Sequence, residues 1–199
     1  MGQMKWISRG RIQVTLTKEE QNEAVRVAHE RHLSQRQTGR VDFKARPQDD
    51  GRMLDLLGSL AEQAVASAFG LPWDGKFKPI AEWDVWRRAG HDVSGLEVKS
   101  TKRYNGSLIL HRESRPELPA VLVIIESSSS FKLVGWTFTK EGQQERFWRE
   151  KPDVPESCFM VPQSYLKTMT DLFMLLGLDV PEPEKEVTAE ELEQLLSTV

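Results

Sequence analysis

Two carboxylates and one amine lie close together in the segment 92–99, and their chemical types suit metal binding. Residues 96–99 alternate between apolar and charged side chains, which predicts a half-buried strand with Glu97 and Lys99 on one face. Asp92 precedes this strand by a few residues. Because Mg²⁺ and Mn²⁺ prefer oxygen ligands, we predict that Asp92 and Glu97 bind a divalent metal ion beside the Lys99 ammonium group.

A tight turn between the two carboxylates would bring them together. Ser94-Gly95 is typical of a two-residue hairpin turn, which would pair Val93 with Leu96 and Asp92 with Glu97. Residues directly opposed on a hairpin have Cβ atoms about 5 Å apart, and two like charges at that distance repel each other. A cation between the carboxylates removes this repulsion. The hairpin therefore supports the prediction of a metal site.

Asp92 followed by Glu97-Val98-Lys99 resembles the core motif of the PD-(D/E)XK nuclease superfamily, whose members have a restriction-endonuclease-like fold. The resemblance implies hydrolysis of phosphodiester bonds, above all in DNA, with Mg²⁺ or Mn²⁺ as the cofactor. It implies that Asp92, Glu97 and the backbone carbonyl of Val98 bind the ion. Lys99 would orient or deprotonate the attacking water, or stabilise the developing negative charge.

A further carboxylate is expected on the helix that precedes the motif. The apolar stripe of residues 53–69 predicts this helix, and Gly70 is a natural C-terminal stop. Glu62 lies at the margin of the stripe and has no basic residue one helical turn away. In the superfamily that the motif resembles, the first helix often carries a glutamate directed into the metal site. The resemblance thus makes Glu62 a catalytic and metal-binding candidate, whereas an exposed glutamate on the helix shoulder is the alternative.

Helices and strands both occur along the sequence, which indicates an α/β fold. An alternating strand at 12–16 precedes Thr17 and Glu20, which form a capping box and begin a helix that runs to about residue 35. We expect a loop at 36–52 and mostly irregular structure at 141–163. Apolar patterns and caps predict the other elements, which are strands at 107–110, 120–126 and 131–136, a turn at 127–130, and helices at 164–176 and from 188.

The resemblance covers about residues 53–138. It implies a restriction-endonuclease-like core, in which a central mixed β-sheet is flanked by helices. We expect one nuclease-like domain over residues 1–180, with residues 1–52 as an N-terminal extension of a strand and a helix. Residues 181–199 are expected to form an acidic C-terminal tail.

Positive charge gathers toward the N-terminus and around the motif, although the chain has a net charge of −3 from 27 basic and 30 acidic residues. This polarity is typical of a phosphate-binding face with a remote acidic tail. A solvated helix face with a charged loop is the alternative. The candidate nucleic-acid-binding residues are Arg36, Arg40, Lys44, Arg46, Ser100, Lys102, Arg103 and His111.

The sequence predicts a protein of a reducing compartment that does not enter membranes. It has a single cysteine, Cys158, and no apolar run near the roughly 18–20 residues of a membrane span. His29 and His32 lack further ligands close by in sequence, so we expect no zinc site. Val134-Gly135-Trp136 resembles small phage-encoded members of the superfamily, which implies a cytoplasmic location, in the host if the protein is phage-encoded. The expected partner is DNA, with a homodimer or a protein partner bound by the tail left open.

Three hypotheses for the function remain. The first is a metal-dependent DNA nuclease, and the second is a non-catalytic module on the same fold that binds nucleic acid or protein. The third is an unrelated α/β protein in which Glu97 and Lys99 form a surface ion pair, which contributes only about 0–1 kcal/mol. Two details bear on the motif itself: His91 takes the place of the usual proline, and Asp84 is a second candidate for the first acid.

Overall fold

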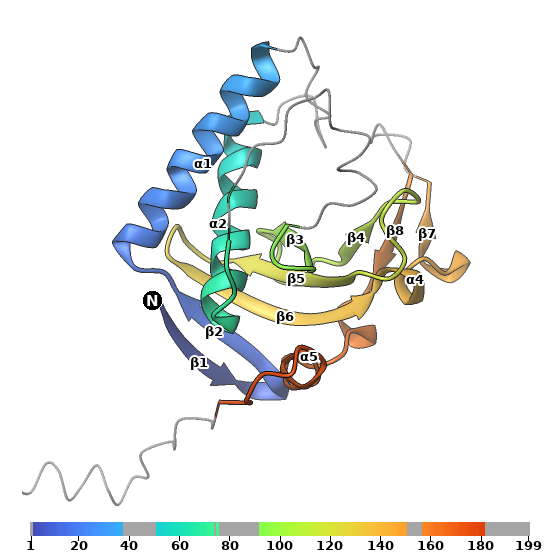
Figure 1. Cartoon of the computed structure of the whole chain (residues 1–199). Helices are drawn as coiled ribbons and strands as arrows, with labels where there is room; N and C mark the ends of the chain where they lie inside the picture. The colour runs from blue at the N-terminus through green and yellow to red at the C-terminus, as the bar shows by residue number, and fades with distance from the viewer. Residues whose placement is uncertain (1, 38–50, 74, 76–91, 151–156, 182–199) are drawn as a thin grey trace, which may run out of the picture.

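A five-stranded mixed β-sheet forms the centre of the molecule (Figure 1). The computed structural model describes residues 2–37, 51–73, 75, 92–150 and 157–181. The strands lie in the order β1-β2-β6-β5-β3. Their bounds are Gln3–Ile7 for β1, Arg11–Thr15 for β2, Ser130–Phe138 for β6, Pro119–Ile125 for β5 and Glu97–Thr101 for β3. This confirms the predicted α/β class and the mixed central sheet.

The strand that carries the motif lies at one edge of this sheet. β3 pairs with β5 in parallel, whereas the other neighbouring strands of the sheet pair antiparallel. β5 is buried from Ala120 to Ile125 and forms the predicted hairpin with β6. Its side chains contribute to a separate apolar core on each face of the sheet. Because β3 ends the sheet, only one of its two edges is paired within it.

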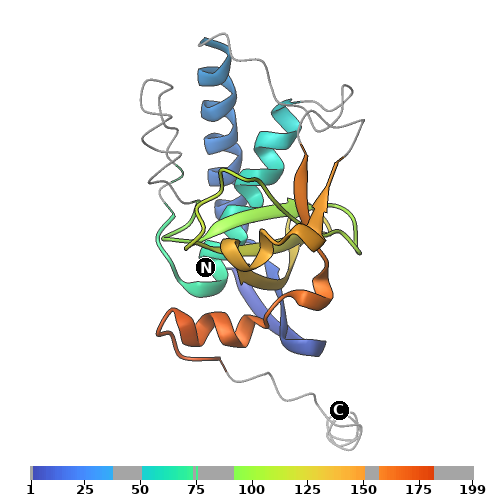
Figure 2. The same ribbon diagram turned by 90° about the vertical axis from the view of Figure 1, so that its right-hand side faces the viewer.

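Helices cover one face of the sheet. α1 (Lys18–Gln37) and α2 (Gly51–Phe69) lie side by side in both views of the fold (Figures 1 and 2), and α2 contacts β3 and the central strands. The short helix α5 (Met169–Leu175) packs on β6 and adds its apolar side chains to the same core. Within the described ranges, no helix combines the length and the apolar composition needed to cross a membrane.

The ends of the two long helices follow the sequence signals. The Glu20 N–H donates to Thr17 Oγ1 at 3.2 Å, and the Thr17 N–H donates to Glu20 Oε2 at 2.8 Å, so the predicted capping box is present. At the end of α2, Gly70 adopts a positive φ of 61°. The Leu71 N–H then donates back to the Ala66 carbonyl at 2.9 Å. This is the left-handed glycine termination expected for the helix.

A second, smaller sheet covers the other face. It has the order β4-β8-β7, with β4 at Leu108–Leu110, β8 at Cys158–Val161 and β7 at Trp148–Arg149. Its apolar side chains pack with those of β5 and β6 in the second core. The prediction that residues 141–163 are mostly irregular was therefore wrong for β7 and β8. Strands of two and four residues are too short to show an alternating pattern.

The structure corrects three other element predictions. The helix predicted at 164–176 begins only at Met169, because Lys167 pairs its backbone with Trp136 and Thr168 then caps the helix. α1 ends at Gln37 and α2 begins at Gly51, so both ends of the predicted loop at 36–52 are helical, and residues 38–50 lie outside the described residues. β1 was not predicted at all, and it places the N-terminal hairpin in the same sheet as β3. Asp84, the second candidate for the first acid, and residues 182–199 of the expected acidic tail lie outside the described residues.

Candidate metal and phosphate site

The turn between the two acids has the predicted form. Val93 and Leu96 make an antiparallel bridge, in which the Val93 N–H donates to the Leu96 carbonyl at 3.1 Å and the Leu96 N–H donates to the Val93 carbonyl at 2.7 Å. Ser94 and Gly95 occupy the two turn positions with φ of 37° and 87°. Both values lie in the left-handed region that two-residue hairpin turns of this type require, and glycine adopts it at little cost.

Asp92 is tied to β3 through both its backbone and its side chain. Its N–H donates to the Leu96 carbonyl at 2.9 Å, and its Oδ2 accepts from the Val98 N–H at 2.8 Å. The N–H and C=O of one strand residue point to the same edge of the strand. The Val98 carbonyl therefore points to the same side as the Asp92 carboxylate, which is the unpaired edge of β3.

Glu97 and Lys99 lie together on the face of β3 opposite Leu96 and Val98. The latter two side chains are buried in the helix-covered core, so the predicted alternation is confirmed. Lys99 Nζ lies 2.7 Å from Glu97 Oε1, and the two side chains keep 31% and 15% of their surface exposed. The Ser114 hydroxyl donates to the same Glu97 oxygen at 3.4 Å, which links the site to the turn after β4.

Glu62 is buried, with 6% of its surface exposed, and it is paired with an arginine of the neighbouring helix. Arg31 Nη1 donates to Glu62 Oε1 and Arg31 Nη2 donates to Glu62 Oε2, each at 2.7 Å. Trp73 Nε1 donates to Oε2 at 2.9 Å. The sequence offers no basic partner on α2 itself, and the structure supplies one from α1.

Arg31 is a site residue that sequence reasoning missed. It lies 31 positions before Glu62, so only the packing of α1 on α2 brings the two together. The signal that could have found it is Glu62 itself. A carboxylate near a core without a partner on its own helix requires a cation from another element.

The charges of the site interact strongly. Burial raises the pKa of Asp92 to about 6, and the negative charge of Glu62 adds to this rise. Burial lowers the pKa of Lys99, but the charges of Glu97 and Asp92 outweigh burial and hold that pKa above its usual value. Lys99 is therefore an ammonium ion at neutral pH, and Asp92 is a carboxylate that a nearby cation would stabilise.

The donor groups at the edge of β3 fit a hard divalent ion. Among the described residues, no three His, Cys, Asp or Glu side chains are grouped so that they could hold a metal together. Two carboxylates, Asp92 and Glu97, and the Val98 carbonyl are the oxygen donors available at this edge. Mg²⁺ commonly takes only one or two carboxylates from a protein and keeps several waters, so this donor set suits it.

The predicted nucleic-acid-binding residues lie in different places. Ser100, Lys102 and Arg103 are exposed at and beyond the end of β3, whose last residue, Thr101, is about 13 Å along the strand from Glu97. His111 lies in the turn after β4, the same turn whose Ser114 reaches Glu97. Arg36 lies in the last turn of α1. Three further candidates, Arg40, Lys44 and Arg46, lie outside the described residues.

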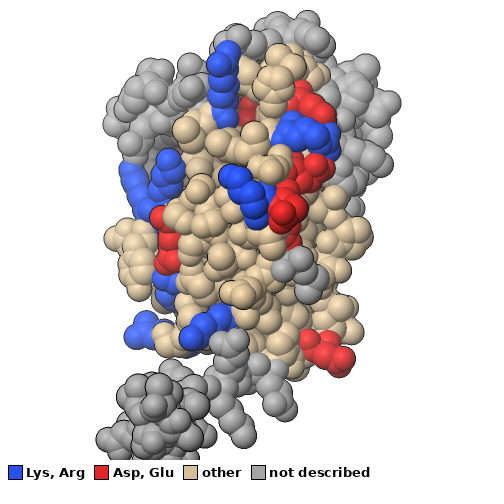
Figure 3. Space-filling model, turned by 90° about the vertical axis from the view of Figure 1, so that its left-hand side faces the viewer, with Lys and Arg blue, Asp and Glu red and all other residues tan. Residues whose placement is uncertain are grey.

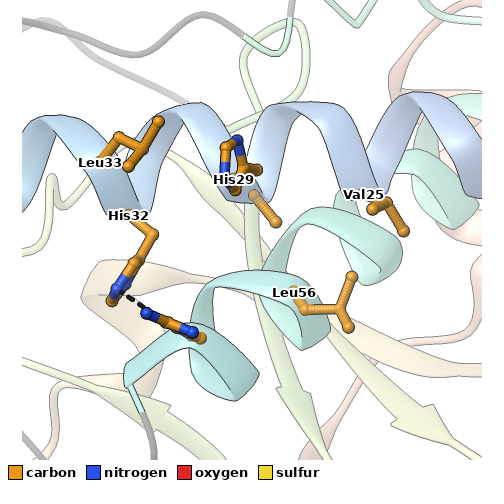
Figure 4. Close-up of a pocket in the computed structure, with 7 residues that line it drawn as sticks. Val25, His29, His32, Leu33 and Leu56 are labelled. Carbon is orange, nitrogen blue, oxygen red and sulfur yellow. Dashed lines mark hydrogen bonds between the residues drawn. The ribbon is translucent and has the colours of Figure 1, made fainter.

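A groove of about 250 Å³ lies between α1 and α2 (Figure 4). His32 is buried there, and its Nε2 accepts from Arg52 Nε at 3.2 Å. Its Nδ1 lies 3.5 Å from Asp55 Oδ2. The groove is lined by Val25, Ala28, His29, His32, Leu33, Arg52 and Leu56, with no carboxylate among them. It therefore does not offer the oxygen donors of the site at β3.

The face of the molecule that carries α1 has mixed charge. Positive and negative side chains lie next to each other there (Figure 3), as in the ion pairs of Arg26 with Glu23 and Glu30. The described residues of this face thus do not form a basic patch.

Comparison of the chain with protein-family models, curated proteins and solved structures gave no match.

Proposed function

We propose that this protein is a metal-dependent nuclease that hydrolyses phosphodiester bonds in DNA. The observation that carries the proposal is the meeting of four charged residues from two elements. α2 contributes Glu62, and the hairpin contributes Asp92, Glu97 and Lys99, whose charges perturb one another. Residues of these types at these positions are the ones that the motif resemblance names.

Each residue has a role that its surroundings support. Asp92, Glu97 and the Val98 carbonyl would hold Mg²⁺ or Mn²⁺. The bound ion would polarise the scissile phosphate and lower the pKa of a water molecule that attacks it. Lys99 is protonated, which favours stabilisation of developing negative charge over removal of a proton from water. Its ion pair with Glu97 and the Ser114 hydrogen bond fix the orientation of the Glu97 carboxylate.

The order and packing of the elements support a restriction-endonuclease-like core. α2, with Glu62, comes first, the Asp92 hairpin leads into β3, and further strands follow. α2 packs against β3, and β3 lies parallel to β5 in the central sheet. This is the arrangement that the resemblance implies for residues 53–138.

A non-catalytic module that binds nucleic acid or protein is the alternative function. One observation favours it, since both oxygens of Glu62 already accept hydrogen bonds from Arg31. The third hypothesis, a mere surface ion pair, fits the site less well. Glu97 and Lys99 do form an ion pair, but both side chains are partly buried and Asp92 lies within electrostatic reach of each.

A cleavage assay tests the proposal. The full chain is incubated with labelled single- and double-stranded DNA in Mg²⁺ or Mn²⁺, with EDTA as the blank. We expect cleavage with metal only, and a loss of about 100-fold or more in Glu97→Ala and Lys99→Ala. A matched control is Lys132→Ala, which removes an ion pair with Glu126 at 2.6 Å elsewhere on the sheet and should cleave normally.

The outcomes separate the hypotheses. DNA binding without cleavage under any metal condition would favour the non-catalytic module. Neither binding nor cleavage would favour the unrelated α/β protein. Cleavage that persists in Glu97→Ala at the wild-type rate would contradict the assigned site, whatever the activity of the chain.

A further inference from the structure

Arg31 and Glu62 form a bidentate salt bridge. Two parallel hydrogen bonds of 2.7 Å join the guanidinium to both carboxylate oxygens. Such bidentate pairs are strong and set the orientation of both partners. Trp73 Nε1 holds the same carboxylate at 2.9 Å, and Ser59 Oγ accepts from Arg31 Nη1 at 3.4 Å. Glu62 is thus engaged as a hydrogen-bond acceptor from protein groups on both oxygens.

Arg31 interacts electrostatically with Asp92 as well as with Glu62, and Glu62 lies on α2, which packs against β3. Burial opposes its charge, but the hydrogen bonds to Glu62 and the negative charges of Glu62, Asp92 and Asp55 favour it. The side chain keeps 21% of its surface exposed, so it is reachable from solvent. A guanidinium has five N–H groups, and within the described residues Glu62 and Ser59 engage only those of Nη1 and one of Nη2. The remaining N–H groups can bind a further anion.

Among the described residues, the formal charges of these five side chains balance around one metal ion. Glu62, Asp92 and Glu97 are acidic and Arg31 and Lys99 are basic, which leaves a formal charge of about −1 for the group. One divalent ion and one phosphodiester, of charge −1, bring the total to zero. A second divalent ion would leave the site with an excess of about two positive charges, in a partly buried place where unbalanced charge is costly.

We infer that Arg31, which Glu62 holds in place, binds the scissile phosphate and supplies the positive charge that a second metal ion would otherwise supply. The site then needs only one metal ion, bound at Asp92 and Glu97. This inference rests on the proposed nuclease function. It assigns Glu62 as the residue that positions Arg31, in place of the metal ligand that the motif resemblance implies. It also brings into the site a residue of α1, outside the region 53–138 that the resemblance covers.

Titration with MnCl₂ by isothermal calorimetry, on the full chain without DNA, measures the stoichiometry directly. We expect one Mn²⁺ per chain in the wild type and none at this site in Glu97→Ala. Arg31→Gln should keep the ion, since it removes a positive neighbour and no ligand. Glu62→Gln should also keep it. A wild type that binds two ions, of which Glu62→Gln loses one, would overturn the inference.

Cleavage by the same variants supplies the second readout. Arg31→Gln should cleave about 100- to 1,000-fold more slowly than the wild type with its Mn²⁺ still bound. Arg31→Lys keeps the positive charge but cannot form the bidentate hydrogen bonds, so we expect it to restore part of the cleavage rate that Arg31→Gln loses. The matched control is Arg26→Gln on the same helix, whose side chain also bonds two glutamates but is 52% exposed and should leave cleavage unchanged. Circular dichroism melts check that each variant is folded.

Two failures are distinguishable. If the wild type binds Mn²⁺ and cleaves DNA but folded Arg31→Gln cleaves as fast as Arg26→Gln, the inference about Arg31 is wrong and the proposed function stands. If the wild type neither binds Mn²⁺ nor cleaves DNA, the proposed function is wrong and the role of Arg31 falls with it.

Discussion

At the scale of single residues, Asp92 is a carboxylate whose surroundings disfavour its charge. Burial and the negative charges of Glu62 and Glu97 disfavour the ionised form of its carboxyl group, whereas the Val98 N–H and the charge of Lys99 favour it. A carboxylate whose pKa rises on folding binds its proton more tightly in the folded state. The stability of the metal-free protein should therefore fall as pH rises from about 4 to about 6.

Asp92→Asn should remove the loss of stability that the charge of Asp92 causes. The amide keeps an oxygen that can accept from the Val98 N–H but carries no charge. With the pKa shifted from 3.8 to about 6, we expect the variant to be more stable than the wild type by about 1–3 kcal/mol at pH 7.5 in EDTA. The difference should vanish below about pH 3, where the wild-type carboxyl is protonated in both states. Urea unfolding at four pH values measures it, and a difference that does not change with pH would contradict the assignment.

At the scale of elements, the close approach of the segment before α5 to β6 depends on a glycine. A Cβ at Gly135 would lie 2.6 Å from the Lys167 carbonyl oxygen and 2.8 Å from Leu166 Cβ. Gly135→Ala should therefore destabilise the fold by about 1–3 kcal/mol, because the backbone of residue 167 must move. The control is Gly58→Ala inside α2, where a Cβ meets nothing within 4 Å. That variant should gain up to about 1 kcal/mol of helix propensity. Thermal melts of both variants test the pair, and equal effects would contradict it.

The elements also show what the sequence could and could not predict. The Ser94-Gly95 turn, the alternation in β3 and the Thr17–Glu20 cap are local, since each depends on residues a few positions apart. These predictions were confirmed. β7 and β8 are too short to show a periodic pattern, and the pairing of β8 with β4 spans about fifty residues. Long-range pairing of this kind leaves no local signal in the sequence, and neither does the bidentate salt bridge between Arg31 and Glu62.

At the scale of the whole molecule, metal binding should be coupled to folding. The carboxylates of the site come together only in the folded chain, so an ion that binds there stabilises the native state. At a Mn²⁺ concentration about 100 times the Kd, the gain is about 2.7 kcal/mol, or a rise in Tm of roughly 5–10 °C for a chain of this size. Differential scanning fluorimetry measures it. Glu97→Ala should abolish this rise in Tm. Glu126→Ala, which removes the ion pair of Glu126 with Lys132 elsewhere on the sheet, should keep it.

The position of β3 at the rim of the sheet has a consequence for solubility. A strand with one unpaired side presents free N–H and C=O groups that invite strand addition by another copy of the chain. Here the Val98 N–H on the unpaired side donates to the Asp92 carboxylate, and the ion pair of Glu97 and Lys99 lies next to Val98 in the same strand. Selection against self-association alone would thus retain an acidic residue at position 92, whatever the function of the chain.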